Sequence, residues 1–262
     1  MNAFVQSANL PRSCSAVLYG QKYAEFLEEP LKKRGIRSIL VPDNRSVDPR
    51  LSGHVDLMVF HAGGERLFLA PQLRDSFLAR ELEKEGAILS FPSQVQGKNY
   101  PEDAMMNICS VGNSAFLNPR SAAKEIVDFL TNDSERNLIQ CKQGYSRCAI
   151  CPVDESALIT ADRGAAKAAK RAGLSVLLIS DGFIQLEGFP YGFIGGASFK
   201  ISEHELAFTG TLDGHPDGDR ILSFLLERKV KPVFLTEHSI FDIGSAIPVF
   251  ESTRSISLVL AG

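Results

Sequence analysis

The same order of elements recurs five times along the 262-residue chain: a first strand of small or polar residues, a second strand, a helix and a third, apolar strand. The first strands are predicted to begin near His54, Met105, Arg147, Gly192 and Phe241, at spacings of 51, 42, 45 and 49 residues. A fixed period of roughly 40–50 residues is the sequence signature of a ring or an array. Five such strands around one axis would point alternate residues at a central funnel, and they carry most of the residues capable of chemistry.

Four of these units are complete. The second unit is predicted as strands 56–61 and 66–69, helix 71–85 and strand 87–91, and the third as strands 107–111 and 115–117, helix 119–130 and strand 137–140. The fourth unit is predicted as strands 148–153 and 157–160, helix 162–172 and strand 175–179, and the fifth as strands 193–199 and 205–209, helix 216–228 and strand 231–235. Proline in the first turn is expected to open three of the helices, and Asp162 is expected to cap the fourth. Glycines are expected to end three helices in a left-handed conformation, at Gly35, Gly86 and Gly173.

The first unit lacks its leading strand. It is predicted as strand 15–19, helix 23–34 and strand 37–41, whereas a spare strand, 242–250, lies at the other end of the chain. The economical hypothesis is that the C-terminal strand pairs into the first unit and closes the ring. Closure also removes exposed sheet edges, which are prone to aggregation.

Composition favours one globular body and excludes several classes of protein. No Gly/Ser or Pro-rich linker divides the chain, so residues 1–262 are predicted to form a single domain. The net charge is −3 and the basic clusters lie on predicted helices, which argues against binding to nucleic acid. No apolar run has membrane-spanning length and no signal peptide is recognisable, so we expect a cytoplasmic protein without a membrane partner. Its five cysteines should then be reduced.

The segment from Gly144 to Pro152 carries the strongest local signal, because Cys148 lies at the start of a predicted inner strand beside Arg147. A cation beside a thiol favours the thiolate, which is the setting of a nucleophile, and Cys148 should therefore react with iodoacetamide faster than the other cysteines. Two other interpretations stay open. Cys148 and Cys151 could be small apolar residues packing a strand, or the Cys-x-x-Cys pair could bind a metal or be redox-active. The sequence assigns no role to Cys109, Cys141 and Cys151.

His54 and Asp56 occupy the equivalent position of the second unit. They alternate on a predicted strand and so should face the same side. A histidine with a nearby carboxylate is a candidate general base with an orienting partner, although a surface pair at the start of a strand has the same pattern.

The other predicted inner strands supply candidate ligand contacts. Gly195 and Gly196 would let another group approach the backbone closely, either a substrate or a neighbouring part of the chain. The remaining candidates for the funnel are Asn107, Glu187, Ser198, Asp242 and Ser245, of which Asp242 is suited to binding a cation.

These features together resemble the pentein, or α/β-propeller, superfamily, a five-fold pseudosymmetric ring of β-β-α-β units. Gly53-His-Val-Asp56 resembles the Gly-His-x-Asp of agmatine deiminases, whose histidine is the acid/base. The segment from Arg147 to Pro152 resembles the sequence around the arginine deiminase nucleophile, and residues 187–198 are similar to their substrate-binding strand. The chain also resembles an uncharacterised bacterial family assigned to this fold. The cysteine differs in position: it lies in the fourth unit here, but near the C-terminus in those enzymes.

The resemblance implies a cysteine-dependent hydrolase or transferase acting on a guanidine or amidine small molecule, without a metal or organic cofactor. Cys148 would attack the guanidinium carbon, His54 would protonate the leaving amine and then activate water, and Asp56 would orient His54. Asp242 or Glu187 would bind the cation of the substrate. The alternative is a non-catalytic pentein that serves as a binding or scaffold protein, and homo-oligomer formation is left open.

Overall fold

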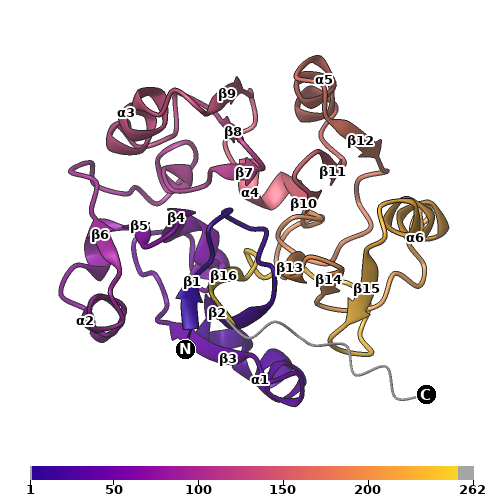
Figure 1. Cartoon of the computed structure of the whole chain (residues 1–262), viewed down its shortest axis with the longest axis horizontal. Helices are drawn as coiled ribbons and strands as arrows, with labels where there is room; N and C mark the ends of the chain where they lie inside the picture. The colour runs from indigo at the N-terminus through magenta and orange to yellow at the C-terminus, as the bar shows by residue number, and fades with distance from the viewer. Residues whose placement is uncertain (1, 253–262) are drawn as a thin grey trace.

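The computed structural model describes residues 2–252, in which five small β-sheets surround a common centre (Figure 1). In four of the sheets an inner strand pairs antiparallel with a middle strand, and the middle strand pairs parallel with an outer strand. These strands are β4 (Val59–Gly63), β5 (Arg66–Leu69) and β6 (Ile88–Ser90); β7 (Cys109–Val111), β8 (Ser114–Leu117) and β9 (Asn137–Gln140); β10 (Ile150–Asp154), β11 (Ala157–Thr160) and β12 (Ser175–Leu178); β13 (Ser198–Ser202), β14 (Glu205–Phe208) and β15 (Lys231–Phe234). The predicted five-fold ring is confirmed.

The first sheet closes the ring with strands from the beginning and the end of the described part of the chain. Its order is β1 (Asn2–Phe4), β16 (Ile247–Ser252), β2 (Cys14–Gly20) and β3 (Arg37–Val41). Strand β16 is antiparallel to β2, with Ile247 opposite Leu18, and β1 pairs with the other edge of β16. The predicted closure by the C-terminal strand is therefore confirmed, and β1 adds a fourth strand that the repeat did not indicate.

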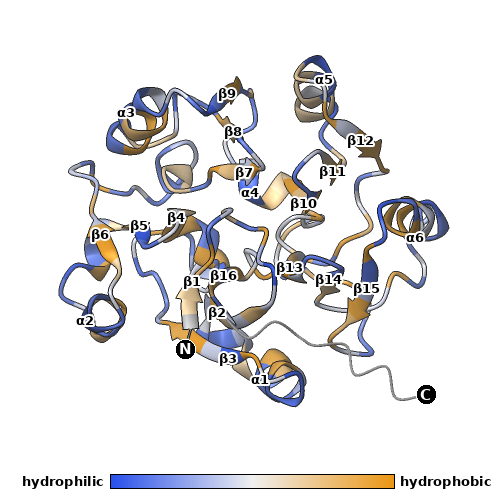
Figure 2. Cartoon of the chain, viewed as in Figure 1, coloured by the Kyte–Doolittle hydropathy of each residue, from blue (hydrophilic) through white to orange (hydrophobic). Residues whose placement is uncertain are grey.

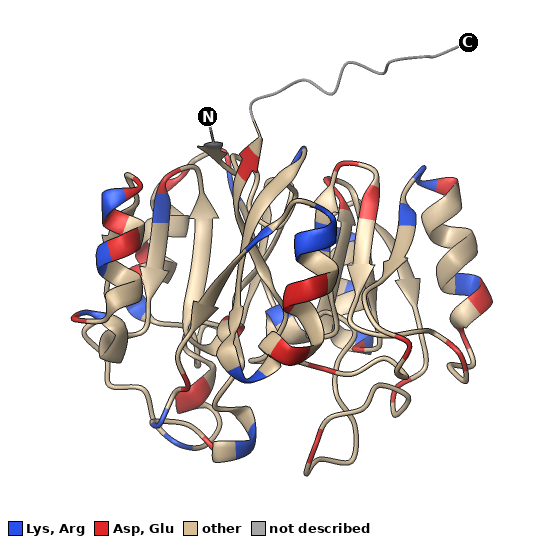
Figure 3. Ribbon diagram, turned by 90° about the horizontal axis from the view of Figure 1, so that it is seen from below, with Lys and Arg blue, Asp and Glu red and all other residues tan. Residues whose placement is uncertain are grey.

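One helix in each unit connects the middle strand to the outer strand and lies on the rim (Figure 1). These helices are α1 (Ala24–Lys33), α2 (Phe77–Lys84), α3 (Lys124–Asn132), α5 (Arg163–Arg171) and α6 (Gly218–Glu227). Their apolar faces turn toward the sheets (Figure 2), and their charged residues lie mostly on the outer surface (Figure 3). The main hydrophobic core therefore fills the space between sheets and helices, as amphipathic helices on a half-buried sheet require.

The helix ends agree with the prediction at the three glycines and at Asp162, but the helices do not begin at the prolines that were expected to open them. Asp162 accepts a hydrogen bond of 2.6 Å from the Ala165 amide, and the three terminating glycines have φ values of 71°, 96° and 83°. Pro71 opens a 3₁₀ turn, Pro71–Leu73, and α2 begins only after Ser76, whose hydroxyl accepts from the Ala79 amide. Helices α3 and α6 also begin after, not at, the prolines predicted to open them.

The inner strands begin later than predicted, and this difference determines where the polar residues lie. Residues 55–57 form a 3₁₀ helix before β4, and Cys148 lies in the short helix α4 (Ser146–Ala149) before β10. Gly195 and Gly196 lie in a turn before β13. The prediction that these residues alternate along strands is wrong, because their amides do not bond into a ladder: the Asp56 amide donates to the Gly244 carbonyl, and the Gly196 amide donates to the Cys148 carbonyl. They meet instead at one end of the ring, in the segments leading into the inner strands.

Candidate active site

Five buried polar side chains converge at this end of the ring: His54, Asp56, Asn107, Cys148 and Asp242. Each is 3% exposed or less. They come from the segments that precede β4, β7, β10 and β16, so four of the five units contribute to the cluster. We call these five residues the central cluster.

Cys148 is held by hydrogen bonds from two other units. Its thiol donates to Asp56 Oδ2 over 2.7 Å, and the Asn107 amide donates to Cys148 Sγ over 3.4 Å. Asn107 Oδ1 accepts from the backbone amides of Arg147, at 2.6 Å, and Cys148, at 3.3 Å. Asn107 therefore fixes both the backbone and the sulfur of Cys148.

Two polar atoms of the cluster have no hydrogen-bond partner among the described residues, His54 Nε2 and Asp56 Oδ1. The ring of His54 lies against Tyr23, with 6.3 Å between the ring centroids. Buried polar atoms in native proteins are almost always satisfied, so these two mark a place where a ligand or water could bind. No hydrogen bond joins His54 and Asp56, and Asp56 accepts a hydrogen bond from the Cys148 thiol instead. The predicted orienting role of Asp56 therefore has no support in this geometry.

The electrostatics of the cluster keep the thiol protonated. Burial, followed by the charges of Asp56 and Asp242, raises the pKa of Cys148 well above its ordinary value. Burial and the neighbouring Asp242 raise the pKa of Asp56 to about 7, whereas burial and the Lys22 charge lower the pKa of His54 to about 3. At neutral pH the cluster thus combines a thiol, a neutral imidazole and carboxyl groups that are costly to ionise.

Arg147 does not act on the thiol as the sequence suggested. Its guanidinium is buried and donates to the carbonyls of Ile150, Gly195 and Ser198, at 3.3, 3.0 and 3.4 Å. The expectation that a neighbouring cation makes Cys148 a thiolate is wrong for the ligand-free chain, because desolvation and the charges of two carboxyl groups raise the pKa of Cys148. Arg147 instead ties the Cys148 segment to the turn before β13.

Asp242 is the second carboxyl group of the cluster. Its two oxygens accept from the amides of Gly244 and Phe193, each at 2.8 Å, yet burial still raises its pKa to about 6. A Cβ on Gly196 would overlap this carboxylate, and one on Gly244, at φ 69°, would overlap His54. Glycine is needed at these two positions because another part of the chain lies where a side chain would begin. Gly195 similarly contacts the backbone around Cys148.

Three predicted contacts lie outside the central cluster. Ser198 and Ser245 are fully buried and donate to backbone carbonyls, Ser198 to Ile194 at 2.6 Å and Ser245 to Ser198 at 3.2 Å. Glu187 is exposed on the loop between β12 and β13. The sequence analysis did not identify Tyr23 and Gly244, because their roles depend on contacts with another unit of the ring. The only local signal was that Gly244 directly precedes Ser245, a residue that the sequence did indicate.

A cavity of about 740 Å³, the mouth cavity, reaches the cluster at Asp242. Its lining residues are Lys22, Tyr23, Phe26, Arg50, Gln185, Leu186, Glu187, Phe189, Pro190, His238, Ser239, Phe241 and Asp242. Cys148 does not line it, so the thiol is covered in this structure.

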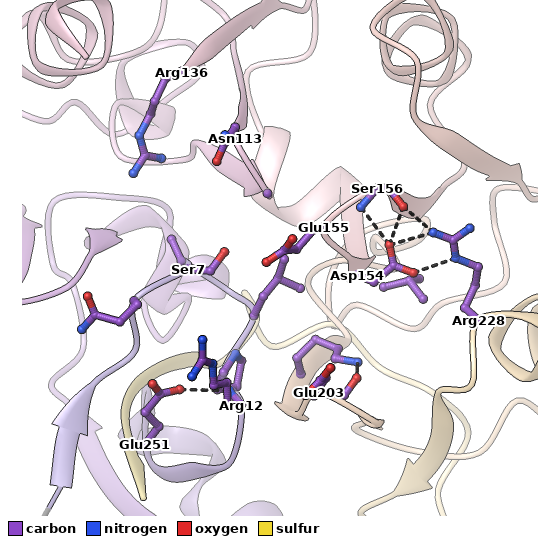
Figure 4. Close-up of a pocket in the computed structure, with 17 residues that line it drawn as sticks. Ser7, Arg12, Asn113, Arg136, Asp154, Glu155, Ser156, Glu203, Arg228 and Glu251 are labelled. Atoms are coloured by element: carbon purple, nitrogen blue, oxygen red, sulfur yellow. Dashed lines mark hydrogen bonds and ion pairs between the residues drawn. The ribbon is translucent and has the colours of Figure 1, made fainter. Parts of the chain in front are cut away.

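A larger cavity, about 870 Å³, lies at the opposite end of the inner strands, where Asp154 pairs with Arg228 (Figure 4). None of the predicted site residues lines that cavity. Of these two cavities, the mouth cavity is therefore the one connected with the predicted chemistry.

The donor atoms of His54, Asp56 and Cys148 lie within 4.8 Å of one another and could hold a divalent metal such as zinc.

None of the helices described between residues 2 and 252 is both long and apolar enough to span a membrane.

Comparison with known proteins identifies the family and the fold. A family model described as "Family of unknown function (DUF6873)" matches residues 19–247. No curated protein gives a significant match.

Solved structures with the pentein fold match nearly the whole chain. The amidinotransferase SxtG of saxitoxin biosynthesis from Microseira wollei is 11% identical, with a TM-score of 0.59, covering 95% of this chain and 98% of that one. The inosamine-phosphate amidinotransferase StrB1 of Streptomyces griseus is also 11% identical at a TM-score of 0.59, with coverage of 95% and 97%. A cysteine-to-serine mutant of DDAH from Pseudomonas aeruginosa, complexed with citrulline, is 10% identical at 0.53, with coverage of 89% and 96%. Because the sequence identity is so low, these structural matches establish the pentein fold alone.

Proposed function

We propose that this chain, which belongs to the family of unknown function DUF6873, is a cysteine-dependent hydrolase or transferase that acts on a guanidinium or amidinium group of a small molecule. The observation that carries the proposal is the direct contact of the Cys148 thiol with Asp56, beside a second carboxyl group and a neutral His54 whose Nε2 has no hydrogen-bond partner among the described residues. The pentein neighbours include amidinotransferases and a deiminase, which is consistent with this chemistry.

A cationic substrate supplies the charge that the cluster lacks. Asp56 and Asp242 have raised pKa values because they are buried, and the guanidinium of Arg147 is occupied by backbone carbonyls. A guanidinium bound between the two carboxylates would stabilise their ionised forms and lower the pKa of Cys148 at the same time. The thiol is therefore activated only when substrate is present.

The reaction balances with this chain's own groups. Cys148 transfers its proton to His54, and its sulfur forms a bond to the guanidinium carbon. The carbon–nitrogen bond then breaks as His54 passes a proton to the leaving amine. Water, deprotonated by His54, attacks the remaining thiouronium carbon; the carbon–sulfur bond breaks and the thiol regains its proton. An amine in place of water would make the same enzyme a transferase.

The test compares two alkylating reagents that differ in charge, chloroacetamidine, which is cationic, and chloroacetamide, which is neutral. With EDTA present to exclude metal, we expect chloroacetamidine to label Cys148 about tenfold faster or more, as judged by peptide mass spectrometry, because a buried anionic site concentrates a cation. The Asp242→Asn variant should lose most of this preference. Equal labelling by both reagents, or preferential labelling of another cysteine, would overturn the proposal.

The alternative, a non-catalytic protein that binds guanidinium ligands, is favoured by one observation: Cys148 is only 3% exposed and its proton is held by Asp56. This alternative expects methylguanidine to bind the wild type and Cys148→Ser equally, with no ureido product and no ammonium released. An enzyme should release ammonium or transfer the amidino group, and Cys148→Ser should abolish that turnover.

A further inference from the structure

We infer that the substrate carries its cationic group on an aromatic or apolar tail that lacks a carboxylate. The inference rests on the proposed function and concerns the mouth cavity. Asp242 belongs both to the lining of this cavity and to the central cluster, and Tyr23, also in the lining, lies against His54. A group bound by Asp242 therefore leaves the rest of its molecule in the mouth cavity.

Aromatic rings form one wall of the mouth cavity. Phe26 lies edge-to-face with Phe241, with 5.5 Å between centroids, and with His238, at 5.8 Å. Phe189, on the loop between β12 and β13, also lines the cavity. Such rings offer large apolar contact area and favour a flat apolar tail over a strongly hydrated one.

The two cations of the lining are already engaged. Arg50 donates to Asp48 through Nε and Nη2, at 3.0 and 2.7 Å, and to the Gly188 carbonyl through Nη1, at 2.6 Å, while its guanidinium lies 4.1 Å from the Phe189 ring centroid. Lys22 Nζ donates to the Arg50 carbonyl at 3.0 Å.

Because the charge of Arg50 is already paired with Asp48, a tail carboxylate would have to compete with Asp48 for it. It would also face Glu187 and Asp242, the two acidic residues of the lining. An amino-acid or guanidino-acid tail is therefore disfavoured, whereas an aryl or alkyl tail meets complementary rings.

The experiment measures protection of Cys148 from chloroacetamidine by four ligands: methylguanidine, benzylguanidine, 4-guanidinobutyrate and L-arginine. We expect benzylguanidine to protect at concentrations about tenfold lower than methylguanidine, as burial of one aromatic ring would give, and the two carboxylates to protect no better than methylguanidine. Protection by 4-guanidinobutyrate or arginine at lower concentration than benzylguanidine would overturn the inference.

Matched phenylalanine variants locate the effect. Phe26→Ala should reduce the benzylguanidine-to-methylguanidine protection ratio by about fivefold or more, because it removes one aromatic contact. Phe77→Ala, at a position on α2 that is 70% exposed, should keep the wild-type ratio. An unchanged ratio in Phe26→Ala with native circular dichroism would contradict the inference.

The two proposals fail in different ways. If chloroacetamidine does not label Cys148, or methylguanidine gives no protection, the proposed function fails. If chloroacetamidine labels Cys148 and methylguanidine protects it, but the carboxylate ligands protect best, only the tail assignment fails.

Discussion

The thiol of Cys148 lies 2.7 Å from the carboxylate of Asp56, although the two residues are 92 positions apart in the chain. One belongs to the helix that precedes β10 and the other to the 3₁₀ turn that precedes β4. A thiol donating to a buried carboxylate couples the titration of both groups, so a change at either should alter the protonation of the other.

Asp56→Asn should make stability less dependent on pH. Burial raises the pKa of Asp56 to about 7, so between about pH 4 and about pH 7 the folded state binds more protons at this site than the unfolded state does. The contribution of Asp56 to stability therefore falls as pH rises through this window. We expect the stability of Asp56→Asn relative to wild type to improve by about 1–3 kcal/mol from pH 5 to pH 8, measured by urea denaturation.

The exposed Asp75 provides the control for that experiment. Asp75→Asn should shift stability little at either pH. A relative stability of Asp56→Asn that is constant, or that declines toward pH 8, would show that Asp56 is ionised at little cost in the folded chain.

Gly244→Ala should be more destabilising than Gly173→Ala. Both glycines have positive φ, 69° and 83°, so both substitutions introduce backbone strain of about 1 kcal/mol. Only at Gly244 would the new Cβ also overlap a side chain, that of His54, whereas nothing lies within 4 Å at Gly173. Thermal denaturation should separate the variants by several degrees, as about 1–2 kcal/mol of additional loss would give. Equal midpoints would mean that His54 can move without cost.

Asn107→Ala should destabilise the chain by about 2–3 kcal/mol, because it leaves the Arg147 amide and the buried Asp56–Cys148 pair without their shared partner. Asn113→Ala, at an exposed position in the turn between β7 and β8, is the matched control and should change stability by less than about 0.5 kcal/mol. Similar denaturation midpoints for the two variants would show that Asn107 does not organise the cluster.

Cys148→Ser and His54→Ala should each abolish amidine hydrolysis, and the double variant should be no worse than either single variant. Nucleophile and acid/base act as one unit, so their free-energy effects do not add. The measurement is ammonium release from the substrate that best protects Cys148. Multiplicative losses in the double variant would assign the two residues to independent steps.

A circular permutant should fold, because Asn2 and Ser252 are opposite one another in the β1–β16 pair. It would join residue 252 to residue 2 through a short Gly/Ser linker and open the chain between Gln94 and Val95, which are exposed. Native far-UV circular dichroism and chloroacetamidine labelling of Cys148 are the expected results. An unfolded product would indicate that ring closure depends on the native connection in that loop.

The order of elements and the closure of the ring could be predicted from sequence alone. Strands 37–41, 66–69, 137–140 and 157–160 have the predicted bounds, because local alternation and flanking turn residues determine short strands. The missing leading strand of the first unit and the spare strand at the C-terminus left one economical pairing, which β16 and β2 form.

The candidate site was only partly accessible in this way. The repeat brought His54, Asp56, Asn107, Cys148 and Asp242 to equivalent positions, and these five do meet. It could not reveal that they lie on turns before the strands. The amides of Asp56 and Cys148 bond to other units of the ring, and such long-range contacts cannot be read from a local pattern. The placement of Glu187, Ser198 and Ser245 outside the cluster also depends on contacts with other units.

The protonation state of Cys148 was decided by the tertiary structure alone. The sequence places Arg147 next to Cys148, and that neighbourhood suggested a thiolate. Folding turns the guanidinium toward three carbonyls and brings two carboxyl groups, distant in sequence, to the sulfur. The pKa of a buried group depends on desolvation and on charges within a few ångströms in space, and neither quantity is determined by adjacency along the chain.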